Sequence, residues 1–280
     1  MTSIPLNDTD GAGDGGRSGR TTPQFSRPAG RFLGRWELFV TASYWLAWLS
    51  FSRRTPMGTG IAREFDSLGM GALRLVIPAS LLVGIITIFQ LASQLSQFGA
   101  ESLSVRAIGW FAARELGPVG VALMVVTRSA SGIAGELATM RTNGEIDALR
   151  AMGLNPVKYL VAPKLAALLI AVPGLTILCD ALIVLGGWLG SVAILDVSTR
   201  FYFDQFRQAF ELRDLFIGLV KSIVFAYLIA IVACDEGINV GGEVHAIGAA
   251  ASRAVVYTVL GVLGADTVVN AIFYFIPILA

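Results

Sequence analysis

Four ionisable residues stand inside otherwise apolar stretches of this sequence: Arg128, Asp180, Lys221 and Asp266. A charge inside a membrane is costly, so such residues mark either a functional site or a buried ion pair. Because two of the four are basic and two are acidic, we expect them to pair with one another and to fix the arrangement of their helices. Two alternatives stay open: a proton or ion relay, and contact with lipid headgroups or water in a cavity.

Residues for metal or covalent chemistry are scarce. The only histidine is His245, and the two cysteines, Cys179 and Cys234, both lie in apolar runs, so neither a metal site nor a disulfide framework is expected. Ser129 and Ser131 lack the G-x-S-x-G context of a serine hydrolase. No G-x-x-x-x-G-K-[ST] segment occurs, so we expect no nucleotide site, no catalytic residue and no bound cofactor in this chain.

The composition indicates that the residues named above are carried by membrane-spanning helices. The chain of 280 residues is 55% hydrophobic and 15% charged, whereas a soluble domain carries about 25% charged residues. Its mean hydropathy is +0.69. The net charge of +1 argues against a nucleic-acid partner, which usually requires a clustered basic surface. We therefore predict an all-α, polytopic membrane protein.

A bilayer core about 30 Å thick requires roughly 20 apolar residues of helix. Five stretches are expected to span it: 75–100, 116–135, 165–195, 215–234 and 254–280. Lys and Arg are concentrated in the segments that would lie on the same side as the N-terminus. This bias predicts a cytoplasmic N-terminus.

Two segments precede the expected spans. Residues 1–30 are rich in Gly, Asp, Arg, Ser and Pro, which predicts a disordered tail ahead of a membrane domain at 31–280. Residues 36–52 are aromatic and flanked by arginines, with an uncharged core of 15 residues that is short for a span. Because Trp and Tyr favour the headgroup region, we predict an interfacial helix at 36–52, and a sixth span is the alternative.

The connection between the second and third spans predicts a short helix within 141–153. Thr142 and Glu145 have the spacing of a capping box at its start. Gly153 is suited to its end, because glycine readily adopts the left-handed conformation found there.

This short helix is amphipathic, with Ile146, Leu149 and Met152 as its apolar residues. It could enter a groove on a soluble partner and transmit movement to the spans, or it could pack against its own spans. A second short helix, rich in aromatic and charged residues, is expected at 201–211 on the opposite side of the membrane.

Polar residues collect near the end of the first span and the start of the second. Gln90 and Gln94 are interleaved with Leu91, Leu95 and Phe98, as in a helix that faces a cavity for acyl chain and headgroup. The same pattern also suits hydrogen bonds between helices.

Arg114 and Glu115 stand before a Gly-Pro pair that suits a helix start or break. Arg114 could attract a phosphate and Glu115 could hold the helix entrance, or both could simply anchor the helix at the interface. Small residues at Gly186 and Gly190 predict a close approach of two helix backbones.

The central block of the sequence is characteristic of one family. It reads Arg114-Glu115-Leu116-Gly117-Pro118, Ala122-Leu123-Met124, Arg128, Glu136-Leu137-Ala138-Thr139-Met140-Arg141 and Glu145-Ile146-Asp147-Ala148-Leu149-Arg150-Ala151-Met152-Gly153. Over about residues 32–278 the chain resembles the MlaE/YrbE permeases, the membrane subunits of MCE-linked ABC transporters. The Gly- and Asp-rich N-terminal tail and the acidic pair Asp235-Glu236 depart from the family pattern.

The resemblance implies a homodimer in which each subunit has an interfacial helix and five spans. It also implies a pair of cytoplasmic ABC ATPases that use ATP and Mg, and a periplasmic ring of MCE-domain proteins. Such a system moves phospholipid between the inner and outer membranes, and this chain would lie in the bacterial inner membrane. The rival hypothesis is an ion-coupled secondary transporter that uses Asp180 and Asp266; it is disfavoured because each carboxylate has a candidate basic partner.

The resemblance also implies functional residues. Lipid contacts would come from Gln90, Leu91, Gln94, Leu95, Phe98, Arg114 and Glu115. Coupling to the ATPase would come from Glu136, Arg141, Glu145, Ile146, Asp147, Leu149, Arg150 and Met152.

Overall fold

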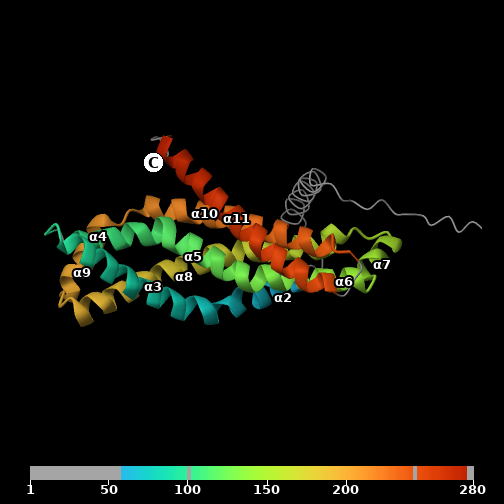
Figure 1. The fold of residues 1–280 in the computed structure, drawn as a ribbon, viewed down its shortest axis with the longest axis horizontal. Coiled ribbons are helices and arrows are strands. Elements are labelled where there is room, and N and C mark those ends of the chain that lie inside the picture. Colours follow the sequence, from blue (N-terminus) through green and yellow to red (C-terminus); the bar gives the residue numbers. More distant parts are fainter. Residues whose placement is uncertain (1–57, 100–101, 242–244, 276–280) are drawn as a thin grey trace, which may run out of the picture.

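A computed structural model describes residues 58–99, 102–241 and 245–275, and all the regular structure in these ranges is helical (Figure 1). Five stretches are long and apolar enough to cross a membrane: Gly60–Ser96, Leu103–Thr142, Val157–Ala193, Leu212–Ile238 and His245–Phe275. The prediction of five spans is confirmed. The predicted tail at 1–30 and the interfacial helix at 36–52 lie outside the described residues.

Three of the spans are built from several helical segments. The first comprises α2 (Gly58–Phe65), η1 (Asp66–Met70) and α3 (Gly71–Ser96). The second comprises α4 (Ser102–Phe111), η2 (Ala112–Leu116), α5 (Gly117–Val125), η3 (Val126–Ala130) and α6 (Ser131–Thr142). The third comprises η4 (Val157–Val161) and α8 (Ala162–Ile194), and α10 (Leu212–Ile238) and α11 (His245–Phe275) are continuous. The η segments are single π-helical turns, which often occur at functional sites.

Two short helices lie at opposite ends of the bundle (Figure 1). At one end α7 (Glu145–Ala151) joins the second and third spans. At the other end, beside α4, α9 (Thr199–Ala209) begins two residues earlier than expected because Ser198 caps it, its side chain accepting a hydrogen bond from the Phe201 amide. Tyr202 of α9 is buried and donates a 2.8 Å hydrogen bond to the Val184 carbonyl, and this burial raises the pKa of its phenol.

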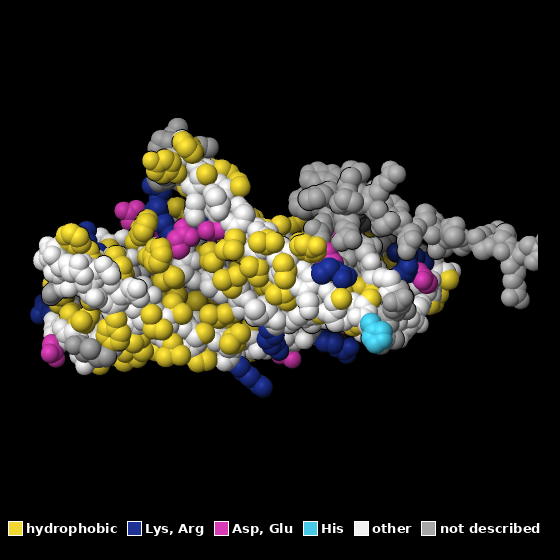
Figure 2. Space-filling model, viewed as in Figure 1, with side chains coloured by type: hydrophobic (Ala, Val, Ile, Leu, Met, Phe, Trp, Pro, Cys, Tyr) yellow, Lys and Arg dark blue, Asp and Glu magenta, His cyan; other side chains and the backbone are white. Residues whose placement is uncertain are grey.

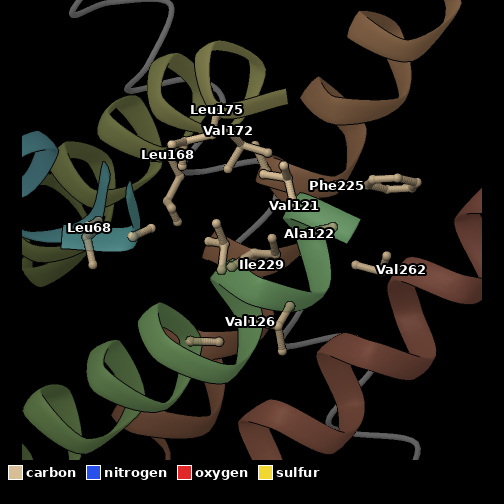
Figure 3. Packing of buried hydrophobic residues seen from close by; sticks show 14 of the residues in the cluster. Leu68, Val121, Ala122, Val126, Leu168, Val172, Leu175, Phe225, Ile229 and Val262 are labelled. Carbon is tan, nitrogen blue, oxygen red and sulfur yellow. The ribbon is translucent and has the colours of Figure 1, made fainter. Parts of the chain in front are cut away.

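The hydrophobic core lies where the spans meet. Figure 3 shows side chains from η1, α5, η3, α8, α10 and α11 converging, among them Leu68, Val121, Leu168, Phe225 and Val262. The outer surface is also apolar, and Figure 2 shows hydrophobic side chains along most of the length of one face. An apolar exterior is expected where the surrounding medium is lipid.

Helices α3 and α8 pack with their backbones almost in contact. A Cβ at Gly186 would overlap the carbonyl oxygen of Leu81, and one at Gly190 would lie 2.8 Å from Cγ2 of Ile88. The close approach predicted from Gly186 and Gly190 is confirmed. It fixes α3 against the rest of the bundle.

Gly186→Ala is expected to destabilise the protein by about 1–3 kcal/mol, because the new methyl group would push α3 and α8 apart. Gly174→Ala, on the same helix with no heavy atom within 4 Å of the added Cβ, is the matched control. Thermal unfolding in a single detergent compares the two variants. Equal melting temperatures would show that the α3–α8 contact is looser than described.

Helix α11 leaves the bundle along its C-terminal part (Figure 1). Its buried residues are Ala250, Ala254, Thr258 and Val262, one on each turn, and no described residue of the helix after Val262 is buried. Beyond Val262 the apolar residues Leu263, Val268 and Ile272 are exposed.

Candidate functional site

A charged cluster lies inside the bundle around Lys221 of α10, whose side chain is 0% exposed. Its Nζ donates hydrogen bonds to Glu115 Oε1 at 2.8 Å and to the Arg114 carbonyl oxygen at 3.0 Å. Asp266 Oδ1 of α11 lies 2.9 Å from the same nitrogen, as an ion pair without hydrogen-bond geometry. One buried ammonium thus joins α10, η2 and α11.

Pro118 follows η2 and cannot donate a hydrogen bond to the Arg114 carbonyl. In a regular helix the amide of residue 118 would donate to the carbonyl of residue 114, but proline has no amide hydrogen. Lys221 donates to this carbonyl at 3.0 Å.

Arg114 does not pair with Glu115, its neighbour in the sequence. Its Nε donates to Asp214 Oδ1 at the start of α10, and its guanidinium lies 5.4 Å from the centre of the Trp110 ring. Asp214 is 2% exposed and also accepts a hydrogen bond from the Glu211 amide. Arg114 is therefore paired with the buried carboxylate of Asp214.

The expectation that the four intramembrane charges pair with one another holds for Lys221 and Asp266 and is wrong for the other two. Arg128 lies on the outside of the bundle and donates to the Ser67 carbonyl at 2.9 Å, in space left by Gly71. Balanced charge in the sequence does not indicate on which face of a helix each residue lies.

Asp180 is buried between α8 and the start of α5. Neither of its carboxylate oxygens has a hydrogen-bond partner among the described residues. Its Oδ1 lies so close to Gly117 that a Cβ there would overlap it.

An apolar cavity of about 360 Å³ opens beside the charged cluster. Glu115 and Asp266 are its acidic lining residues, and the rest of its wall comes mainly from α3, α5 and α8. Such a cavity, apolar with a few convergent polar groups, is typical of a site for a small or amphiphilic ligand. Arg114 does not line it.

A second hollow of about 310 Å³ lies on the outer face of α3 and is lined by Ile86, Phe89, Gln90, Ser93 and Gln94. Two predicted lipid-contact residues, Gln90 and Gln94, are therefore together there. We call this the α3 groove.

The other predicted lipid-contact residues of α3 are divided between two faces. Leu91 packs against the core, Leu95 is half-buried and Phe98 is exposed. The predicted set of five does not form one surface.

Helix α7 is held firmly to the end of α6. Asp147 forms ion pairs with Arg141 of α6 and Arg150 of α7, and Ile146 is fully buried in the core. Ile146 therefore anchors the helix to its own bundle and does not lie on the exposed side of α7. Glu145 and Met152 are exposed, Met152 to 66%, and Leu149 is half-buried.

The expected capping box at the start of α7 is also wrong. Gly144, with φ of 77°, is the N-cap, and Thr142 still belongs to α6, where its hydroxyl donates to the Ala138 carbonyl. The expected end is confirmed. Gly153 has φ of 74°, and its amide and that of Leu154 bond back to Arg150 and Leu149, as in a Schellman motif.

Glu136 of α6 contacts its own chain. It accepts a 2.7 Å hydrogen bond from Lys164 of α8, which also donates to Glu64 of α2 at 2.8 Å. Sequence reasoning missed Lys164, Glu64 and Asp214 as paired residues. The available signal for Lys164 was its place directly before a long apolar run, because a lysine there requires a partner once it is buried.

Comparison with known proteins gives one consistent result. Residues 61–272 match the family described as Permease MlaE. A probable ABC transporter permease protein of Rickettsia felis is 32% identical over 257 residues, 91% of this chain and 96% of that protein. The intermembrane phospholipid transport system permease protein MlaE of Haemophilus influenzae is 27% identical over 215 residues, 76% of this chain and 82% of that protein. The chloroplastic protein trigalactosyldiacylglycerol 1 of Arabidopsis thaliana is 27% identical over 212 residues, which is 76% of this chain and 61% of that protein.

Proposed function

Because the chain belongs to the MlaE permease family of ABC transporter permeases, we propose that it moves phospholipid between two membranes and is driven by a separate ATPase. The observation that carries this proposal is α7, a short helix that is held to α6 and presents exposed side chains at one end of the bundle. The sequence has no phosphate-binding loop of its own. ATP and Mg would be bound by the partner.

The partner ATPase would dock on the exposed side of α7. Met152 supplies an exposed apolar contact, and Glu145, Asp147 and Arg150 are exposed charges around it. A helix held to its bundle on one side and free on the other suits insertion into a groove on a soluble protein. The α7 end would then be cytoplasmic, in agreement with the bias of Lys and Arg.

Phospholipid would use the α3 groove and the cavity beside Lys221. The groove combines two glutamines with Ile86 and Phe89, so it offers hydrogen bonds to a headgroup and apolar surface to an acyl chain. The cavity adds an apolar wall that ends at Glu115 and Asp266. Arg114, which is committed to Asp214, would support this region without contacting lipid.

A second copy of the chain would cover part of the exposed apolar side of α11, where Val256, Leu260 and Val268 are each more than half exposed. The far end of the bundle, with α4 and α9, would face the periplasm and the MCE-domain ring. In this proposal the protein would lie in a bacterial inner membrane.

Met152→Asp is expected to weaken ATPase binding by about 30-fold, since a buried interface anchor is typically worth 2 kcal/mol or more. The measurement is co-purification of the ATPase and phospholipid with the tagged permease from mild detergent. Met152→Leu keeps the apolar volume and is the control. Undiminished ATPase recovery with Met152→Asp would remove α7 as the docking helix.

An ion-coupled secondary transporter is the second candidate, favoured by the carboxylate of Asp180, which has no hydrogen-bond partner in the part of the chain that the structure describes. Asp266, in contrast, is paired with Lys221. Lipid movement by the purified chain alone, driven by a proton or sodium gradient and abolished by Asp180→Asn, would favour this candidate over the ATP-driven one.

A further inference from the structure

Lys164 lies at a junction of three helices. It is in the first turn of α8, with a side chain 2% exposed, between Glu64 of α2 and Glu136 of α6. The helical stretch that contains it begins at η4, so Lys164 lies about two turns inside a continuous span. A buried ammonium loses its hydration, so it is stable only when it is paired. The two carboxylates therefore hold Lys164 in place.

The two carboxylates differ in exposure. The side chain of Glu136 is 54% exposed, whereas that of Glu64 is 23% exposed. If Glu136 moves away, its carboxylate is already half hydrated and Lys164 stays neutralised by Glu64. The Glu136 contact can therefore open without leaving a buried charge unpaired.

The same contact lies between α7 and the α3 groove. Glu136 is on α6, which ends at Thr142 just before α7, and the Arg141–Asp147 ion pair ties these two helices together. Glu64 is on α2, which continues through η1 into α3 as one span. If α7 moved, it would move α6 through the Arg141–Asp147 ion pair. The movement of α6 would then be transmitted to the first span through the contacts of Lys164 with Glu136 and Glu64.

We propose that the Glu136–Lys164 ion pair is a latch that opens during each transport cycle, while Glu64 keeps Lys164 in place. Opening frees α6 and α7 to move relative to α8 and the first span. Lys164 and Glu136 are thus positioning residues that couple the partner's nucleotide cycle to the α3 groove. This inference rests on the proposed function.

The test uses the complex of permease and ATPase, purified together and reconstituted in phospholipid vesicles. Fluorescent phospholipid transfer and ATP hydrolysis are measured on the same sample. Glu136→Gln is expected to lower the lipid moved per ATP by about threefold, the effect of losing a partly exposed ion pair. The ATPase should still co-purify, because Glu136 is not on the exposed side of α7.

Two further variants separate a latch from a merely structural contact. Glu136→Asp keeps a carboxylate at this position and should retain most of the lipid moved per ATP that Glu136→Gln loses. Asp66→Asn removes an exposed carboxylate two residues from Glu64 and should leave the lipid moved per ATP unchanged.

The outcomes distinguish the two proposals. A stable wild-type complex in which Glu136→Gln moves as much lipid per ATP as the wild type would overturn the latch alone. Failure of the wild-type chain to bind any ATPase would overturn the proposed function, and the latch with it.

Discussion

Lys221→Met is expected to destabilise the bundle by about 3–5 kcal/mol, the usual cost of removing one partner from a buried ionic cluster. Glu115 and Asp266 would be left with no cation between them, and the Arg114 carbonyl would lose its donor. Methionine has nearly the length of lysine, so lost packing would contribute little. The measurement is thermal unfolding in detergent together with the yield of folded protein.

A neutral version of the cluster is the control for this prediction. Combining Lys221→Met with Glu115→Gln and Asp266→Asn removes all three charges, and replacement of a whole buried ionic cluster is often close to neutral. The triple variant should therefore be more stable than Lys221→Met alone. If it is no more stable, the loss comes from the geometry around Lys221 and not from unpaired charge.

Arg114→Ala is expected to lower stability by about 3 kcal/mol through the buried Asp214 carboxylate that it leaves unpaired. Asp214 is 2% exposed, and its contact with Arg114 joins η2 to the start of α10. The resemblance implies a different outcome, in which Arg114 contacts lipid and its loss mainly reduces bound phospholipid.

A double-mutant cycle with Asp214→Asn decides between these two roles. If Arg114 acts through Asp214, the double variant recovers stability relative to Arg114→Ala, because the unpaired charge is gone. Lipid recovered with each purified variant is measured in parallel. Normal stability of Arg114→Ala combined with loss of bound lipid would restore the lipid-contact role.

The number of spans could be predicted from the sequence because long uncharged stretches have few alternatives to crossing a membrane. The described spans begin earlier than predicted where charged residues are paired or exposed at the ends, as with Glu64 and Lys164 in the first and third spans. A span predicted from a run of uncharged residues stops at the first charge, so it leaves out such residues even when they belong to the helix.

The partners of charged residues could be predicted only in part. Lys221 and Asp266 lie on facing sides of adjacent helices, whereas Arg128 faces outward and Asp180 faces a backbone. The spacing of residues along a helix predicts which of them share a face. It does not predict which other helix packs against that face. For the same reason the apolar pattern of α7 did not show that Ile146 faces its own bundle.

The start of α7 could not be predicted because two rules competed. Thr142 and Glu145 fit a capping box, but α6 continues through Thr142, and Gly144 can adopt a positive φ at little cost. The end of α7 was predictable, because Gly153 readily adopts a positive φ and Pro156 disfavours the helical conformation of Asn155 before it.

Pro118 shows that an uncharged residue can help to specify an ionic site. It has no amide hydrogen to offer the Arg114 carbonyl, and this carbonyl supplies a third oxygen to Lys221 beside those of Glu115 and Asp266. Transplanting the three ionic side chains into another helical protein would therefore not reproduce the cluster. The graft would also need a main-chain oxygen held where that of Arg114 lies.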